Sequence, residues 1–597
     1  MKHITHIKFI PRALEIIWRN SRLNTVLRLL LVLVQGVLPL LTVYLMKLIV
    51  DSVTKAISEA QPDPFPILLL IAALTLTHLA LYSLNSFSRF LQEKQKMQVL
   101  DELSDRIHEQ SVRMDYAYYE NAHYYDSMHR AQKQALSRPT ATFDNTAQLL
   151  QNGVSMLAML SLLLSFHWLV SLLLLIAAVP GIWFQLRYSD RLFHWELANT
   201  DAMRKSAYYS SILTEDQYAK EIRLFDLGNE FINRFSHLKT ELRTERLQLA
   251  QKRSLHQVAA QCITVLTIFG SFAFVAYRAV MGLITLGDMV MYYQAFQKGV
   301  NYLRAMLSSL AKLFEDSLYL ANLFEFLRFE PEIQDPPDPE KISAKAGAIE
   351  FRQVAFTYPF AAQPVFTDLS FKVRAKEHIA LVGPNGSGKS TLVKLLCRLY
   401  DPDTGTIEIN GLNIQHYRIK DLRQALSVVF QDFSRYHLSA SENIRLGDIH
   451  SQTDEQTIQT AAQTAGIHSR LQELPDSYQT PLGKRFENGM DLSAGEWQKI
   501  ALARVFMRDA PIVIFDEPTS ALDAQAEYDL LQRLKSMTRD KTSIWISHRL
   551  ASASLADRVL FLQNGRITEQ GPHRDLMKNN NEYAAFYRKQ SQFYCDS

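Results

Sequence analysis

The sequence has few cysteines and no excess of charge of either sign. Its 597 residues include 3 cysteines, and none shows CxxC spacing, which argues against a disulfide scaffold or a zinc module. The 64 Lys+Arg residues nearly balance 61 Asp+Glu residues, for a net charge of +3. That balance gives no global case for binding nucleic acid. A composition of 47% hydrophobic and 11% aromatic residues excludes a disordered or collagen-like chain, and the length predicts several domains.

Long apolar stretches are concentrated in the first half of the chain. About 20 apolar residues in succession cross the hydrocarbon core of a bilayer. Several such runs in a row favour membrane spans over the buried helices of a large soluble protein. The third and fourth stretches are joined by a very tight turn, Phe166–Trp168. The six expected spans are Leu29–Val50, Ile67–Leu84, Val154–Ser165, Trp168–Leu186, Val258–Val280 and Leu286–Leu313.

Lysine and arginine cluster between the second and third spans and again between the fourth and fifth. Because basic segments stay on the cytoplasmic side, both termini and both of these segments are predicted to be cytoplasmic. The segments have helical composition and almost no glycine or proline, so each is read as a long helical hairpin that leaves the bilayer. We therefore expect residues 1–330 to form an all-α transmembrane domain with six spans and two long cytoplasmic helical hairpins.

A proline-rich stretch, Glu330–Pro339 (EPEIQDPPDP), ends this helical pattern. Dense proline stiffens and extends a chain, so residues 331–345 are predicted to be a linker. Beyond it, short β-rich runs alternate with helical patterns, which predicts an α/β domain with a parallel sheet over residues 346–590. Residues 591–597 are left as a C-terminal tail. The predicted strands include Ile349–Thr357, His378–Val382, Ser427–Phe430, Ile512–Phe515 and Ser543–Ser547.

Residues 383–391 (GPNGSGKST) match the phosphate-binding loop pattern G-x-x-x-x-G-K-[ST], between an apolar strand and a helical segment. Glycines let consecutive N–H groups turn toward phosphate oxygens, and the following helix N-terminus favours the anion. Lys389 is expected to contact the β- and γ-phosphates of ATP, and Ser390 to bind Mg²⁺. The candidate nucleotide-binding residues here are Gly383, Asn385, Gly386, Ser387, Gly388, Lys389, Ser390 and Thr391.

Two carboxylates follow a second apolar run, Ile512–Phe515. Asp516 is predicted to hold the metal ion, directly or through its water. Glu517 is predicted to polarise the attacking water as a general base. An acidic pair at this distance from a phosphate-binding loop is typical of nucleotide hydrolases.

The segment Leu492–Glu496 (LSAGE), which opens a helix, resembles the LSGGQ signature of ATP-binding cassette (ABC) transporters. Tyr358 then resembles the aromatic residue that stacks on adenine, and Gln431 the glutamine that senses Mg²⁺ and the membrane domain. His548 resembles the switch histidine that contacts the γ-phosphate, and Asp523 ends a segment that resembles the D-loop. With six preceding spans, the resemblance covers nearly the entire chain, which looks like a bacterial half-size ABC exporter of the six-helix, domain-swapped type.

The signature departs from the family pattern at two positions. Ala494 stands where the family usually has glycine, and Glu496 where it often has glutamine. Ser493 and Gly495 are kept. The resemblance implies that all four residues meet the nucleotide of an opposite subunit. Upstream, Leu482–Gly489 also differs from the usual family sequence.

The resemblance implies ATP-driven export by alternating access, with two composite ATP sites in a dimer of two copies, and ATP and Mg²⁺ as ligands. Glu517, His548 and Gln431 are the expected catalytic residues; Ser390, Gln431 and Asp516 are the expected metal site. The implied location is the bacterial plasma membrane, with no nucleic-acid partner. A heterodimer stays open, as does a membrane-anchored ATPase that senses or regulates. A soluble P-loop ATPase and an importer are disfavoured.

The sequence does not identify the cargo. Peptides, lipids and amphipathic drugs are all possible, and a likeness to exporters of modified peptides places peptides first. Polar residues inside the expected spans are candidate cargo contacts, because burying them in lipid is costly. The hairpin tips Tyr116–Tyr125 and Glu215–Asp226 resemble coupling helices. The polar candidates are Gln35, Lys47, His78, Asn85 and His167.

Overall fold

A computed structural model of the chain describes residues 8–595, apart from 59–62, 121–127, 129–130, 132–135, 343–346, 360, 451–453, 519–523 and 548–549. The chain divides into two compact units. The first, a helical unit, comprises Met1–Arg113 and Ala122–Phe329. The second, a nucleotide unit, comprises Met114–Asn121 and Glu330–Ser597.

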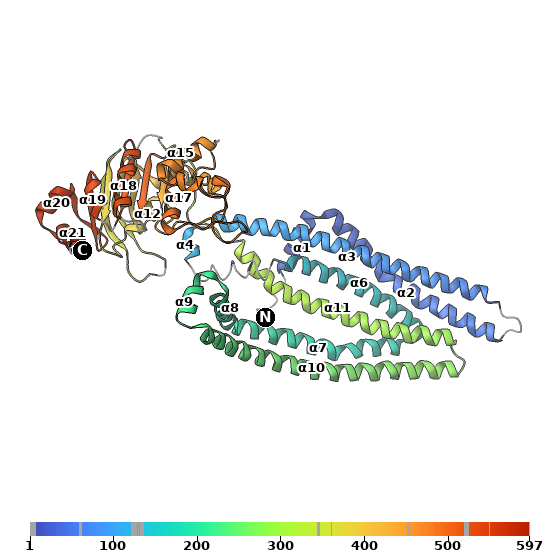
Figure 1. Ribbon diagram of the computed structural model, residues 1–597. Coiled ribbons are helices and arrows are strands. Elements are labelled where there is room, and N and C mark those ends of the chain that lie inside the picture. Colours follow the sequence, from blue (N-terminus) through green and yellow to red (C-terminus); the bar gives the residue numbers. More distant parts are fainter. Residues whose placement is uncertain are drawn as a thin grey trace. The chain divides into compact units, whose positions relative to one another are not determined.

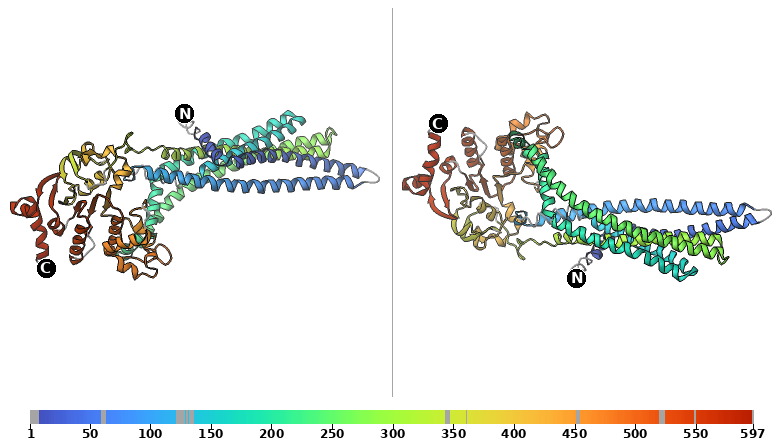
Figure 2. Two further views of the ribbon diagram at one scale, coloured as in Figure 1. Left: turned by 90° about the horizontal axis from the view of Figure 1, so that it is seen from above. Right: turned by 90° about the horizontal axis from the view of Figure 1, so that it is seen from below.

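Long helices that lie side by side build the helical unit, as the blue pair α2 and α3 shows in both further views (Figures 1 and 2). Helix α6 ends at Phe166 and α7 begins at Trp168, so the predicted tight turn is confirmed and consists of His167 alone. The helices are α1 (Phe9–Asn20), α2 (Arg22–Ser58), α3 (Phe65–Arg113), α6 (Arg138–Phe166), α7 (Trp168–Ala198), α8 (Thr200–Thr214), α9 (Ala219–Leu224), α10 (Gly228–Val280) and α11 (Leu286–Phe326).

Large apolar side chains stay exposed on these helices. Leu76 in α3 is 69% exposed and Leu266 in α10 is 74% exposed, a pattern that fits lipid rather than water as the surrounding solvent. Among the described residues, α2, α3, α6 and α10 are long and apolar enough to cross a membrane. The chain is therefore a multi-pass membrane protein; spans at α7 and α11 stay predictions.

Two sheets form the frame of the nucleotide unit. A four-stranded sheet has the order β2-β1-β4-β5, and a six-stranded sheet has the order β10-β9-β3-β8-β7-β6. Neighbouring strands from β9 to β6 run parallel. The strands are β1 (Ile349–Phe356), β2 (Phe366–Val373), β3 (His378–Val382), β4 (Thr404–Ile409), β5 (Leu412–Asn413), β6 (Leu426–Val429), β7 (Ile512–Asp516), β8 (Thr542–Ile546), β9 (Arg558–Gln563) and β10 (Arg566–Gly571).

The five predicted strands are present within one residue of their expected ends. Strands β3, β7 and β8 are buried along their whole length, as continuous apolar runs in a parallel sheet require. Their carboxyl ends meet at one edge, where ligands bind in open α/β sheets. The helices are α12 (Lys389–Leu396), α13 (Ile419–Gln424), α14 (Ala440–Arg445), α15 (Glu455–Ala465), α16 (His468–Gln472), α17 (Ala494–Phe506), α18 (Ala524–Met537), α19 (Leu550–Leu555), α20 (His573–Asn579) and α21 (Glu582–Cys595).

The stretch that follows Phe329 is fixed within the nucleotide unit by hydrogen bonds from backbone N–H groups to aspartate side chains. Asp115, just before α4 (Tyr116–Tyr119), accepts from the backbone N–H groups of Glu332 (2.6 Å) and Ile333 (3.2 Å). Asp335 accepts from the N–H of Ile419 at 2.7 Å. The proline-rich segment and the tip of the first hairpin are thus both built into the second unit.

Candidate nucleotide site

The phosphate-binding loop joins β3 to α12 and requires glycine at two close approaches. A Cβ on Gly383 would lie 2.1 Å from the carbonyl oxygen of Leu562 in β9. Gly388 has φ +104°, and a Cβ there would lie 2.6 Å from the ring of Phe366. Both contacts exclude a side chain, so glycine at these positions lets the loop lie close against the sheet.

Lys389 bends back across this loop. Its ammonium donates to the carbonyls of Gly383 and Pro384, both at 2.9 Å. Burial lowers the pKa of Lys389, while the nearby Glu517 and Asp516 oppose that shift. The buried Ser387 hydroxyl has no hydrogen-bond partner in the described part of the chain. A cation and an unsatisfied hydroxyl in one glycine loop fit a phosphate group.

Asp516 is the last residue of β7 and is 3% exposed. Burial raises its pKa to about 6, although a hydrogen bond with the Ser390 side chain opposes that rise. The two side chains therefore meet, as a shared metal site requires. No group of three or more His, Cys, Asp or Glu that could hold a metal is present among the described residues. A hydroxyl, one carboxylate and nucleotide oxygens are the oxygen ligands that Mg²⁺ takes when phosphates complete its shell.

Glu517 turns sharply out of the sheet, with φ +51°. A left-handed glutamate is unfavourable by itself, and two hydrogen bonds hold it: its N–H donates to Ile546 in β8 (2.9 Å) and its carbonyl accepts from Gln498 (3.1 Å). The Gln431 amide donates to the Glu517 carboxylate at 2.9 Å. Gln498, on α17, is a positioning residue that the sequence analysis missed.

One cavity of about 860 Å³ collects most of these groups. Phe586 of α21 also lines it and was not predicted. The predicted residues that line the cavity are Tyr358, Asn385, Gly386, Gly388, Lys389, Ser390, Thr391, Gln431 and Glu517.

The aromatic residue Tyr358 lies at the mouth of the loop. Its hydroxyl shares a hydrogen bond of 2.9 Å with Thr391, and the ammonium of Lys394 sits 5.2 Å from its ring centre. The ring meets Tyr400 edge-on at 5.3 Å. These contacts hold the ring beside α12, where a planar base could pack on it.

Signature residues do not line this cavity. Ser493 caps α17: its hydroxyl accepts from the N–H of Glu496, whose carboxylate accepts from the N–H of Ser493 at 2.7 Å. Glu496 also pairs with Arg470 at 2.9 Å, a bond that a neutral glutamine would weaken. Ala494 is exposed, so its methyl group clashes with nothing in its own chain. Asp523 and His548 lie outside the described residues.

The tip of the first hairpin contacts α12 directly. Glu120 pairs with Lys394 at 3.0 Å and accepts a hydrogen bond from the Tyr400 hydroxyl. Burial opposes ionisation of Glu120, but the bonds from Tyr400 and Lys394 outweigh it and lower its pKa. Lys394 therefore touches both Glu120 and the ring of Tyr358. The remaining part of the predicted tip, residues 121–125, lies outside the described residues.

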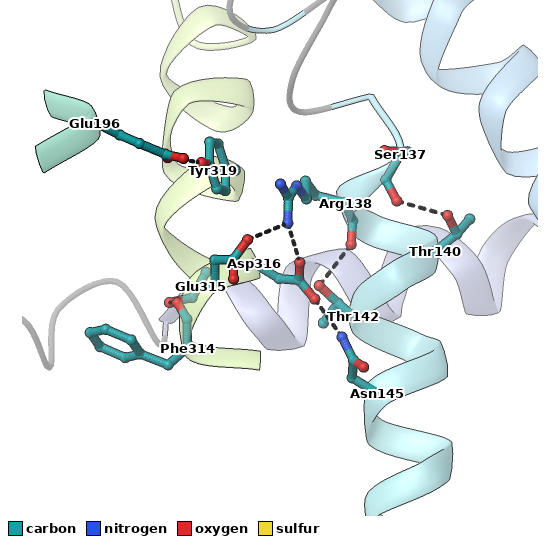
Figure 3. Close-up of polar contacts among 11 residues, drawn as sticks. Ser137, Arg138, Thr140, Thr142, Asn145, Glu196, Phe314, Glu315, Asp316 and Tyr319 are labelled. Atoms are coloured by element: carbon teal, nitrogen blue, oxygen red, sulfur yellow. Dashed lines mark hydrogen bonds and ion pairs between the residues drawn. The ribbon is translucent and has the colours of Figure 1, made fainter. Parts of the chain in front are cut away.

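In the helical unit, a half-buried ion-pair cluster joins α6 to α11 (Figure 3). Arg138 donates to Asp316 at 2.9 Å and to Glu315 at 3.1 Å, and Asn145 donates to Asp316 at 2.8 Å. Tyr319 donates to Glu196 of α7 at 2.7 Å. Helices α6, α7 and α11 are thereby linked by polar contacts, which lie near the start of α6 and near the ends of α7 and α11.

The polar residues singled out inside the spans do not converge on one cavity. Lys47 pairs with Asp288 at 2.6 Å, Gln35 is buried, and His78 and Asn85 are exposed. A cavity walled by cations instead lies between α7, α10 and α11. Four of its cations belong to the basic segment 187–253, and Arg304 comes from α11. The clue available in the sequence was the alternation of aromatic and basic residues in WFQLRYSDR.

Comparison with known proteins bears on the whole chain. A family model described as ABC transporter matches residues 366–520, and one described as ABC transporter transmembrane region matches residues 25–299. The subtilin transport ATP-binding protein of Bacillus subtilis is 29% identical over 582 residues, 96% of this chain and 92% of that protein. The nisin transport ATP-binding protein of Lactococcus lactis subsp. lactis is 29% identical, with 84% of each chain covered.

A further relative and a solved structure also match the chain. An ATP-dependent lipid A-core flippase of Alkalilimnicola ehrlichii is 33% identical over 62% of each chain. The solved structure of a bacterial Atm1-family ABC exporter with ATP bound aligns with a TM-score of 0.81 at 23% identity, covering 96% of this chain and 98% of that one. At that identity the structural match establishes the fold.

Proposed function

The chain belongs to the ABC transporters, as a half-size exporter with one transmembrane region and one nucleotide-binding domain, and from this premise we propose that two copies of it export a peptide cargo. The matched relatives make ATP-driven export the function of this chain. The transport proteins among its relatives favour export over the sensing role that the sequence left open.

The observation that carries the proposal is the contact between Gln431 and Glu517 beside the phosphate-binding loop. Glu517 acts as the general base toward water, since its carboxylate faces the cavity and its backbone is fixed on both sides. Gln431 orients that carboxylate, and Lys389 binds the β- and γ-phosphates. Ser390, Asp516 and Gln431 would hold Mg²⁺, which when bound offsets charge on the phosphates. His548 acts on the γ-phosphate.

A second copy completes each site. Ser493, Ala494, Gly495 and Glu496 lie away from the cavity of their own chain, so their role toward nucleotide needs a partner's cavity; Asp523 acts with them. Binding of ATP then stabilises the closed dimer and hydrolysis releases it, a shift between two states driven by contacts present in one of them. The contact of Glu120 with Lys394 supports the tip of the first hairpin as the element that carries this change.

The cargo and the location complete the proposal. The relatives matched over most of the chain transport subtilin and nisin, which supports the peptide class over lipids and drugs. The basic segments support a plasma-membrane placement with both termini and the nucleotide unit in the cytoplasm.

Sealed vesicles provide the test. The purified chain, reconstituted with its nucleotide unit outward, should accumulate a fluorescent peptide in the lumen on addition of ATP and Mg²⁺, and the Glu517→Gln variant should not. Accumulation by both proteins would refute the assigned base. ATP hydrolysis without movement of any peptide, lipid or drug would refute transport of the proposed cargo.

A further inference from the structure

A cavity of about 640 Å³ lies between α7, α10 and α11 in the helical unit. Figure 1 shows these three helices running beside one another. Among the described residues, no aspartate or glutamate lines the cavity. Its walls carry the five cations Arg187, Arg191, Lys252, Arg253 and Arg304.

Two of these cations lie against aromatic rings. The guanidinium of Arg187 lies 5.0 Å from the ring centre of Trp183, and that of Arg253 lies 4.6 Å from the ring centre of Tyr188. Phe184 stacks on His256 at 4.7 Å. Cation–π contacts orient a guanidinium but leave its positive charge and N–H donors available.

None of the five cations forms an ion pair within the described part of the chain. Arg138, in the same unit, pairs with two carboxylates. Five like charges around one hollow repel each other, and that repulsion is stronger beside low-dielectric walls than in water. An anion inside the cavity would relieve it.

The depth of the cavity bears on what can reach it. Arg187 lies about 28 Å along α7 from Trp168, and Arg304 about 27 Å along α11 from Leu286, at the rise of an α-helix. With Trp168 and Leu286 at the outer ends, both cations reach the inner edge of a hydrocarbon core about 30 Å thick. A ligand would enter from the cytoplasmic side, where cargo for export is made.

We propose that this cavity binds an acidic segment of the cargo peptide. The inference rests on the proposed function and names the charge of its substrate. Guanidinium groups bind carboxylates with two parallel hydrogen bonds. Exposed Trp183 and half-buried Phe184 offer apolar surface to neighbouring side chains of the peptide. Gln257 and Gln261, on the α10 wall, add neutral donors and acceptors.

An anionic lipid headgroup is the competing occupant. Its phosphate or carboxylate would bind the same cations as an acidic peptide does. Its concentration, however, is fixed by the composition of the bilayer. Concave walls from three helices enclose a volume in the range of small-ligand pockets, which fits a short peptide segment. Varying the lipid separates the two occupants.

The test uses three synthetic peptides that share their apolar residues and carry glutamate, glutamine or lysine at the same two positions. ATP turnover is measured against peptide concentration for the full chain in phosphatidylcholine nanodiscs, with and without phosphatidylglycerol. We expect the glutamate peptide to stimulate turnover at the lowest concentration. In Arg187→Gln/Arg191→Gln, its half-maximal concentration should rise about tenfold or more, while that of the glutamine peptide should shift less than about twofold.

Arg243→Gln/Arg246→Gln is the matched control, because both arginines are exposed on α10 and lie outside the cavity lining. It removes the same charge and should respond as the unmodified chain does. Arg187→Glu/Arg191→Glu should instead transfer the preference to the lysine peptide, a gain that misfolding cannot produce.

Three outcomes would overturn the inference. The peptides could stimulate alike, the control could lose as much as the cavity variant, or phosphatidylglycerol could abolish the response to the glutamate peptide, which would assign the cavity to lipid. Failure of the proposed function would give a different result from these three outcomes. In that case Glu517→Gln would not change ATP turnover, or no peptide would stimulate ATP turnover at all.

Discussion

The nucleotide unit and the helical unit arrange their charged side chains in opposite ways. Around the phosphate-binding loop, Lys389, Glu517 and Gln431 are each held by a hydrogen bond of 2.9 Å. In the α7–α10–α11 cavity, two cations lie against aromatic rings, and no carboxylate is among the described lining residues. Fixed polar groups suit one ligand of constant geometry. Unpaired cations on aromatic walls suit ligands that share a charge but differ in shape.

The largest effect that tests this contrast comes from the nucleotide unit. Glu517→Gln keeps the hydrogen-bonding shape but removes the base, so turnover should fall about 10²–10⁴-fold. Binding of a fluorescent ATP analogue should be retained. ATPase assays in nanodiscs measure the first quantity and fluorescence titration the second.

Lys389→Ala is the comparison for that variant. It removes the phosphate contact and should weaken nucleotide binding, so the two substitutions separate catalysis from affinity. Wild-type turnover in Glu517→Gln, or unchanged affinity in Lys389→Ala, would contradict the assigned roles.

A smaller effect is expected from the paired charges of the helical unit. Arg138→Ala leaves Asp316, 2% exposed, with a buried charge and one neutral donor, and should lower the free energy of unfolding by up to about 3 kcal/mol. Thermal unfolding in detergent measures the change.

Arg204→Ala is its control, since the Arg204–Asp201 pair is exposed on both sides and such pairs contribute little. Equal shifts of the unfolding temperature in Arg138→Ala and Arg204→Ala would show that the Arg138 cluster stabilises the protein no more than a surface ion pair does.

The contact between the hairpin tip and α12 should have a moderate effect. Glu120→Gln weakens the bond to Lys394, and cargo-stimulated turnover should fall about two- to tenfold, the range for substitutions that alter coupling between sites. Basal turnover and peptide-stimulated turnover are compared in one preparation. Glu350→Gln is the control, because it removes a surface carboxylate paired with Lys372 and Arg352. It should leave the ratio of peptide-stimulated to basal turnover unchanged. If this ratio fell as much as in Glu120→Gln, the hairpin tip would have no special role in coupling.

The smallest effect belongs to the signature. Ala494→Gly restores the usual family residue at an exposed helix start, and should cost under about 1 kcal/mol of stability with turnover changed by less than about threefold. A much larger gain in turnover would mean that the methyl group of Ala494 obstructs the partner's nucleotide.

The sequence was most informative where function depends on neighbours in the chain. The loop 383–391 and the strand before Asp516 could be predicted because their geometry comes from consecutive residues. The tight turn at His167 could be predicted for the same reason. Gln498 was not predicted, since its partner Glu517 comes from another part of the fold. The tip Tyr116–Tyr125 was singled out, but its partners Lys394 and Tyr400 were not, since they lie far away in the sequence. The cationic cavity was hidden because three separate helices form it, and the search for polar groups near span centres missed its inner edge.

The membership of Met114–Asn121 in the nucleotide unit has a consequence for biosynthesis. Glu120 is translated 280 residues before its partner Tyr400, a delay of roughly 14–56 s at about 5–20 residues per second. The tip of the hairpin must therefore wait on the ribosome-facing side of the membrane while most of the helical unit is inserted. A nucleotide unit expressed alone from Glu330 onward would lack this tip and expose Lys394 and Tyr400 to water.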